Sequence, residues 1–142
     1  MAIRLILTAV FSLCFQGVLK AQNEGGMFRG NLYNQEYDVF LRIDLKNKAL
    51  TVPGHELYGP LAGYIGLPTN SFYWLVIDAD IRENTAELQI VNDYGSEDLV
   101  ATLKQQNDTT YTLTQGKGSL IKLPRNGKWM KLPKTLQFNK IR

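Results

Sequence analysis

The stretch from Phe72 to Leu103 constrains the fold most, because three consecutive segments in it alternate apolar and polar residues. Alternation with a period of two is the pattern of a β-strand with one buried face. The segments 72–81, 86–90 and 99–103 are separated by polar turns, so each is expected to run antiparallel to the one before it. This stretch predicts an antiparallel sheet, and it contains no nucleophile paired with a base.

The same spacing continues on both sides of this stretch. Segment 37–45 has the cleanest alternation in the chain, and Asn126-Gly127 predicts a two-residue hairpin, because both residues tolerate positive φ. Further strands are expected at 27–33, 49–52, 56–65, 111–113, 120–123, 128–132 and 135–141. Short strands with short connections and no helical pattern predict an all-β fold, an antiparallel up-and-down meander that closes into an eight- to ten-stranded barrel.

The apolar faces of these strands are expected to form one core. Its predicted members are Tyr37, Val39, Leu41, Ile43, Tyr73, Leu75, Ile77, Leu88, Ile90, Leu99, Leu103 and Leu113. A contiguous core of this kind is what one domain of this length can build.

Residues 1–21 have the composition of a secretory signal peptide, which leaves residues 22–142 as a single domain. Arg4 is followed by an apolar run and by Ala21 at the expected cleavage position. The run is too short to span a bilayer, so we do not expect a membrane-spanning protein. Cys14 is the only cysteine, and a lipid anchor on it is the less favoured alternative, because Leu13 precedes it where a small residue is needed. The sequence predicts a secreted or periplasmic protein without disulfides.

Charge is distributed unevenly along the chain. Residues 22–108 contain all thirteen acidic residues and six basic ones, whereas residues 109–142 contain eight basic residues and no acidic one. One interpretation is a basic face for an anionic partner. The interpretation we favour is that the closing strands lie beside the acidic early strands, where opposite charges across a sheet are mildly stabilising.

Four segments carry a resemblance to a known family. They are Phe28-Arg-Gly-Asn-Leu32, Val39-Phe-Leu-Arg-Ile43, Leu50-Thr-Val-Pro53 and Leu132-Pro-Lys-Thr-Leu-Gln-Phe138. In strand length and residue type they resemble small lipocalin-like (calycin-type) barrel modules of secreted bacterial proteins. Gly26-Met27-Phe28 stands where lipocalins begin with Gly-x-Trp, Asn92-Asp93-Tyr94 resembles their Thr-Asp-Tyr loop, and Lys140 or Arg142 corresponds to the basic residue of their last strand. The resemblance implies a barrel that holds a ligand or is filled by its own side chains.

We therefore expect a non-enzymatic barrel that binds a small apolar or amphipathic ligand in its mouth, or a secreted protein partner. The candidate ligand-binding residues are Tyr37, Tyr73, Trp74 and Trp129. Trp129 among lysines resembles a stacking residue of a nucleic-acid groove, but export argues against that partner. No cofactor is expected. A structural or adhesive role is the alternative without a ligand.

The alternative from another class is a carboxylate-based hydrolase acting on glycans or esters through Asp78, Asp80, Asp93 or Glu97. His55 beside Glu56 is the other acid–base candidate, but it has no nucleophile nearby and is expected to be a surface residue.

Loop 92–98 contains three carboxylates, Asp93, Glu97 and Asp98, which are candidate calcium ligands. We favour a metal-free loop, in which backbone amides of the turn and a lysine such as Lys128 or Lys131 offset the negative charge.

Overall fold

A computed structural model of the chain describes residues 27–141, and the predicted signal peptide, residues 1–21, lies outside this range. The described chain consists of strands and one short 3₁₀ helix. The strands are β1 (Arg29–Asn34), β2 (Val39–Asp44), β3 (Gly63–Gly66), β4 (Trp74–Arg82), β5 (Thr85–Val91), β6 (Asp98–Gln105), β7 (Thr110–Gly118), β8 (Lys122–Arg125), β9 (Lys128–Lys131) and β10 (Thr135–Ile141), and the helix is η1 (Glu56–Tyr58).

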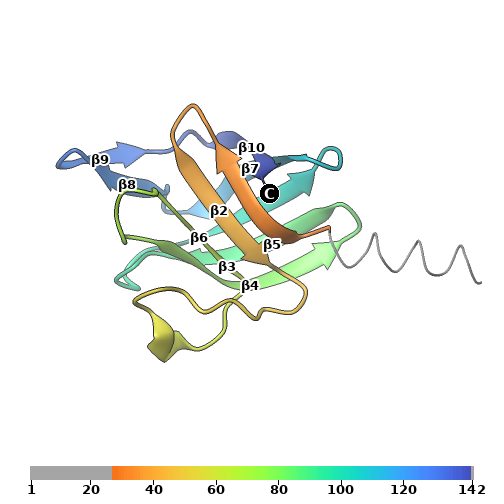
Figure 1. Cartoon of the computed structure of the whole chain (residues 1–142), viewed down its shortest axis with the longest axis horizontal. Helices are drawn as coiled ribbons and strands as arrows, with labels where there is room; N and C mark the ends of the chain where they lie inside the picture. The colour runs from red at the N-terminus through yellow and green to blue at the C-terminus, as the bar shows by residue number, and fades with distance from the viewer. Residues whose placement is uncertain (1–26, 142) are drawn as a thin grey trace, which may run out of the picture.

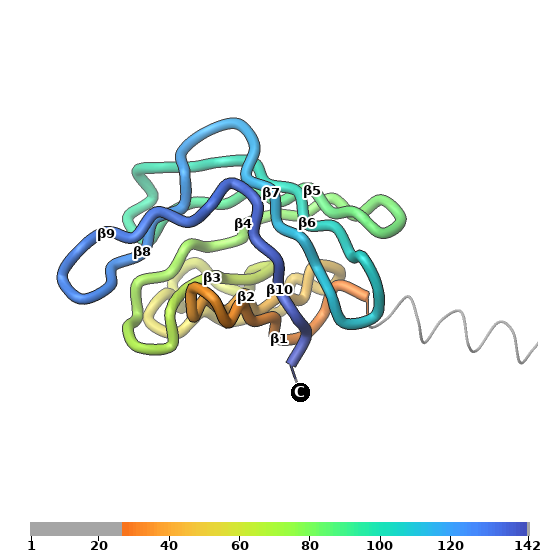
Figure 2. The backbone as a smooth tube through the Cα atoms, turned by 90° about the horizontal axis from the view of Figure 1, so that it is seen from above, coloured from red at the N-terminus to blue at the C-terminus, as the bar shows by residue number. Residues whose placement is uncertain are grey.

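Eight strands form a closed antiparallel barrel in the order β1-β10-β7-β6-β5-β4-β3-β2, in which β1 pairs with both β10 and β2 (Figure 1). Strands β8 and β9 do not join the barrel. They form a separate hairpin, inserted in the sequence between β7 and β10, that projects from one end of the barrel in both views (Figure 2). The predicted all-β, up-and-down barrel is confirmed, because apart from this insertion each barrel strand pairs with the next one along the chain.

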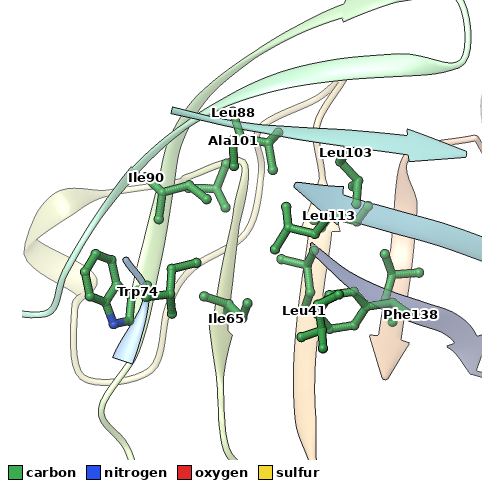
Figure 3. Close-up of a cluster of buried hydrophobic side chains, with 14 of the residues drawn as sticks. Leu41, Ile65, Trp74, Leu88, Ile90, Ala101, Leu103, Leu113 and Phe138 are labelled. Atoms are coloured by element: carbon green, nitrogen blue, oxygen red, sulfur yellow. The ribbon is translucent and has the colours of Figure 1, made fainter. Parts of the chain in front are cut away.

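Side chains that point inward from the barrel strands fill the interior. Figure 3 shows Leu41, Ile65, Leu88, Leu113 and Phe138, which come from five different strands, gathered in one cluster of buried side chains. Burying an aliphatic or aromatic side chain of this size contributes about 1.5–3 kcal/mol relative to leaving it in water. The sequence prediction is confirmed for eight core residues: Val39, Leu41, Ile43, Leu88, Ile90, Leu99, Leu103 and Leu113 are all buried in this cluster.

The prediction was wrong for the inward face of β4. Trp74 and Val76 point into the barrel, whereas Leu75 is buried in a second cluster and Ile77 is 43% exposed. The register of β4 against β5 shifts between Val76 and Asp78, so Ile77 is the extra residue of a β-bulge. Because of this extra residue, Val76 and Ala79, which are three positions apart, both point into the barrel.

The second cluster lies on the outside of the barrel and is covered by the long connection between β2 and β3. Val52 and Leu61 from this connection are buried with Leu75 of β4 and with Tyr64 of β3. Tyr73, also predicted to face the main core, packs against this outer cluster. The predicted strands 49–52 and 56–65 were wrong except where 56–65 overlaps β3. The rest of these segments forms only an isolated bridge between Leu50 and Leu61 and helix η1.

The alternation of strand directions places four connections at one end of the barrel, which we call the cap end. They are the turns and loops 35–38, 67–73 and 92–97 and the insertion 119–134, which contains β8 and β9. The predicted Asn126-Gly127 turn is confirmed, because Asn126 and Gly127 connect β8 to β9 with φ angles of 52° and 75°.

The β4 bulge can be tested with two substitutions that keep a β-branched side chain. Val76→Thr places a hydroxyl in the apolar interior and should lower the free energy of unfolding by about 1–3 kcal/mol. Ile77→Thr changes an exposed side chain and should alter it by less than about 0.5 kcal/mol. Urea denaturation followed by circular dichroism measures both. A larger loss for Ile77→Thr than for Val76→Thr would contradict the register described here.

Candidate binding face at the cap end

The base of the β8–β9 insertion closes the mouth of the barrel. Ile121, Leu123 and Leu132 are buried, and they belong to the same cluster as Trp74 and the rest of the interior. Their apolar area is removed from water only while the insertion lies against the barrel, so hydrophobic burial holds the cap in place. The tip of the hairpin, in contrast, projects into solvent (Figure 1).

Hydrogen bonds fix the orientation of this cap. The indole Nε1–H of Trp74 donates to the carbonyl of Lys122 at 2.8 Å, and the side-chain amide of Asn70 donates to the carbonyl of Pro124 at 2.8 Å. On the other side of the hairpin, Arg125 Nη1 donates to the carbonyl of Tyr37 at 3.1 Å. The connections 35–38 and 67–73 and the first residue of β4 are thus linked to β8.

Gln115 holds both ends of the insertion to β7. Its side chain is 2% exposed, and its oxygen accepts the Ile121 N–H at 2.7 Å while its nitrogen donates to the carbonyl of Pro133 at 2.9 Å. A buried amide satisfied in this way stabilises one arrangement, because any displacement would leave its polar atoms unpaired. The mouth of the barrel is therefore closed by a fixed element.

Aromatic rings gather on the outside of the cap. Phe72 lies between Tyr94 and Trp129, with ring centroids 5.6 Å and 5.2 Å away and edge-to-face geometry in both pairs. Tyr94 is 74% exposed and Trp129 is 52% exposed. Three loops that are distant in sequence thus contribute to one row of rings that remains in contact with water.

Basic side chains flank this row. In the β8–β9 register Lys122 pairs with Lys131, and Pro124 pairs with Trp129, so these residues share one face of the hairpin. Lys122 Nζ lies 5.7 Å from the centroid of the Trp129 ring and 3.6 Å from Glu97 Oε2. We call the surface made by Phe72, Tyr94, Lys122, Trp129 and Lys131 the cap face.

The four predicted ligand-binding residues all lie near the cap end but do not converge. Trp129 is on the cap face, whereas Trp74 is fully buried beneath it. Tyr73 lies on the outside of the barrel, 5.0 Å from the ring of Tyr64, where burial and the neighbouring tyrosine raise its pKa. Tyr37 lies in the β1–β2 turn, partly buried against the interior.

The sequence did not show that the other residues of the cap face lie together with Trp129. Lys122 and Lys131 could have been found from the Asn126-Gly127 turn, because a two-residue turn fixes the pairing of the strands beside it. Phe72 and Tyr94 belong to loops whose position beside the hairpin depends on the closed barrel, and the sequence contains no local signal for it.

Loop 92–98 is organised by Asn92. This buried side chain accepts the N–H groups of Ser96 at 2.9 Å and Glu97 at 3.2 Å. A lysine of the closing strands does face this loop, as predicted, but it is Lys122 opposite Glu97 rather than Lys128 or Lys131, and Asp93 bonds to His55. Among residues 27–141 no three His, Cys, Asp or Glu side chains are grouped so that they could hold a metal ion.

His55 fastens the β2–β3 connection to loop 92–98. Its Nε2 bonds to Asp93 Oδ1, a partner 38 residues away, and its Nδ1 lies 3.2 Å from the carbonyl of Pro53. The ring also packs beside Tyr58 and Tyr73, at centroid distances of 6.1 Å and 6.2 Å. Both ring nitrogens contact oxygen atoms of the protein, so these contacts hold the ring in place. The pairing with Glu56 that the sequence suggested is not formed, since Glu56 accepts the Gly54 N–H instead.

The remaining candidate carboxylates of a hydrolase are exposed and each has its own cation. Asp78 bonds to Lys48 at 2.5 Å, and Asp80 lies 3.3 Å from Arg82. The hydrogen bond from Lys48 lowers the pKa of Asp78. A catalytic general acid requires a raised pKa, so this environment is the opposite of the one a glycosidase acid needs.

The chain was compared with known protein families, curated proteins and solved structures. No family model, no curated protein and no solved structure matches the chain. None of the helices in the described part of the chain has the length and apolar character needed to cross a membrane.

If the His55–Asp93 bond fastens the β2–β3 connection, its loss should make that connection open more often. Asp93→Ala should weaken the attachment of the β2–β3 connection by about 1–2 kcal/mol, which is a 5- to 30-fold faster opening. Hydrogen exchange of the His55, Tyr58 and Gly59 amides, all bonded within this connection, measures it. Asp108→Ala, in the turn after β6, is the matched control and should leave these rates unchanged. Equal rates in the Asp93 variant and the parent protein would contradict the proposed fastening.

Proposed function

We propose that the chain is a non-enzymatic, secreted or periplasmic binding module with a lipocalin-like barrel, and that it binds a small amphipathic ligand on the cap face. The observation that carries this proposal is the row formed by Phe72, Tyr94 and Trp129, in which Tyr94 and Trp129 remain exposed beside the basic hairpin. Scattered exposed apolar side chains are ordinary in soluble proteins, but a contiguous group beside charged residues is typical of a binding surface.

The position of the ligand differs from that expected of a lipocalin-like barrel, in which it enters the mouth. Here the interior is filled by the barrel's own side chains, and Ile121, Leu123 and Leu132 close the mouth. Entry of a ligand would require the cap to be displaced, together with the bonds made by Trp74 and Gln115. The outer surface of the same cap, by contrast, offers rings that are already exposed and positioned.

The cap face suits an amphipathic molecule with one flat apolar side. Aromatic rings supply a large contact area with little conformational freedom to lose, so a ligand that packs against Trp129 gains apolar burial at low entropic cost. The lysines beside the ring supply hydrogen bonds to polar groups at the ligand's edge. Secretion rests on the composition of residues 1–21, and it agrees with a described barrel that contains no cysteine.

The proposal predicts saturable binding of a neutral amphipathic probe, 4-nitrophenyl β-glucoside, to the purified protein. Trp129→Ala should raise the dissociation constant at least about five-fold, because stacking on one aromatic side chain contributes roughly 1–3 kcal/mol. Saturation-transfer NMR, with titration of the protein's own resonances, measures the effect. Tyr58→Ala is the matched control, since Tyr58 is also 52% exposed but lies on the β2–β3 connection. Equal affinity in the Trp129 variant and the parent protein would overturn the proposal.

A further inference from the structure

The β8–β9 hairpin carries like charges directly opposite each other. Of its four cross-strand pairs, Lys122 faces Lys131 and Arg125 faces Lys128. Like charges at paired positions of an antiparallel hairpin are destabilising, whereas opposite charges there would stabilise it. The arrangement therefore lowers the stability of the hairpin.

The acidic part of the barrel relieves only a small part of this repulsion. Glu97 lies 3.6 Å from Lys122, but within the described residues Lys131 has no carboxylate within salt-bridge distance. The interpretation favoured from the sequence, that the closing basic strands lie beside the acidic early strands, is thus wrong for this hairpin, which stands outside the barrel sheet. The second interpretation, a basic face for an anionic partner, describes it better.

A flat apolar surface lies immediately beside the two lysines. Trp129 pairs across the hairpin with Pro124, two positions from the Lys122–Lys131 pair and on the same face. An anion bound to Lys122 would lie near the indole ring, because Lys122 Nζ is 5.7 Å from the centroid of that ring. The hairpin thus presents a stacking surface and two adjacent lysines on the same face.

We propose that the ligand of the cap face is an acidic saccharide: one pyranose ring packs its C–H face on Trp129, and its carboxylate, sulfate or phosphate group binds between Lys131 and Lys122. This inference rests on the proposed function and specifies its ligand class. A sugar suits the surface because its ring has one apolar face and a polar edge, whereas an acyl chain requires an apolar groove that surrounds it. The anion turns the repulsion between Lys122 and Lys131 into two charge-assisted hydrogen bonds.

Glu97 has a specific part in this arrangement. Its carboxylate already contacts Lys122, so it competes with the anionic group of the ligand for that ammonium. Replacing Glu97 by the isosteric glutamine removes the competitor and keeps the shape of the loop. Two substitutions are therefore expected to change the affinity for an acidic sugar in opposite directions. Lys131→Gln weakens binding, and Glu97→Gln strengthens it.

The test compares two probes that differ in one group, 4-nitrophenyl β-glucuronide and 4-nitrophenyl β-glucoside. At low salt the glucuronide should bind about ten-fold more tightly to the parent protein, as expected for a charge-assisted contact to an exposed lysine pair. The difference should shrink as salt is added, because exposed charges are screened. Lys131→Gln should abolish the difference, and Glu97→Gln should enlarge it.

Lys104→Gln is the matched control, because it removes the same charge from an exposed side chain of β6, toward the opposite end of the barrel. It should leave the preference for the glucuronide unchanged. If both probes bind with equal affinity and both lose affinity in Trp129→Ala, the acidic-saccharide inference is overturned and the proposed function stands. A glucuronide preference that persists in Lys131→Gln, or one that Glu97→Gln diminishes, would also overturn it. Failure of both probes to bind would overturn the proposed function itself.

Discussion

The hydrogen bond from the Trp74 indole to the Lys122 carbonyl joins the two parts of this molecule on which its surface depends. Trp74 begins β4 and is fully buried in the barrel interior, and Lys122 begins β8 of the inserted hairpin. The bond lies in an apolar environment, where an unpaired donor or acceptor is costly. It therefore fixes the hairpin on the mouth, and this position brings Trp129 next to Phe72, whose ring also contacts Tyr94.

Closing the mouth changes what the barrel can do. A barrel of eight strands has an interior just wide enough to be filled by its own side chains or to hold one small ligand. In this chain the insertion between β7 and β10 adds Ile121, Leu123 and Leu132 to the interior cluster. The same residues that stabilise the cap also fill the mouth, so the proposed ligand would contact the exposed rings and lysines on the outside.

Local patterns determined most of the fold, and tertiary contacts determined the rest. The alternation of β2, β5 and β6 was sufficient to predict antiparallel barrel strands, and the Asn126-Gly127 turn was sufficient to predict the separate β8–β9 hairpin, because each is a property of neighbouring residues. The first half of β4 is apolar on both faces, so alternation could not choose its inward side, and the bulge at Ile77 shifted the pattern. The cap, and the bond between His55 and Asp93, join residues far apart in sequence, for which the chain carries no local signal.

The central claim, that the cap is a fixed part of the barrel, is tested most directly by hydrogen exchange of the two indole N–H groups. The Trp74 hydrogen is bonded beneath the cap, whereas Trp129 is 52% exposed and serves as the internal reference. A fixed cap predicts that Trp74 exchanges as slowly as the most protected amides of β5 and β6, through unfolding of the whole barrel, while Trp129 exchanges rapidly. Exchange of Trp74 much faster than those amides would show that the cap opens on a folded barrel, and it would contradict the account of a closed interior.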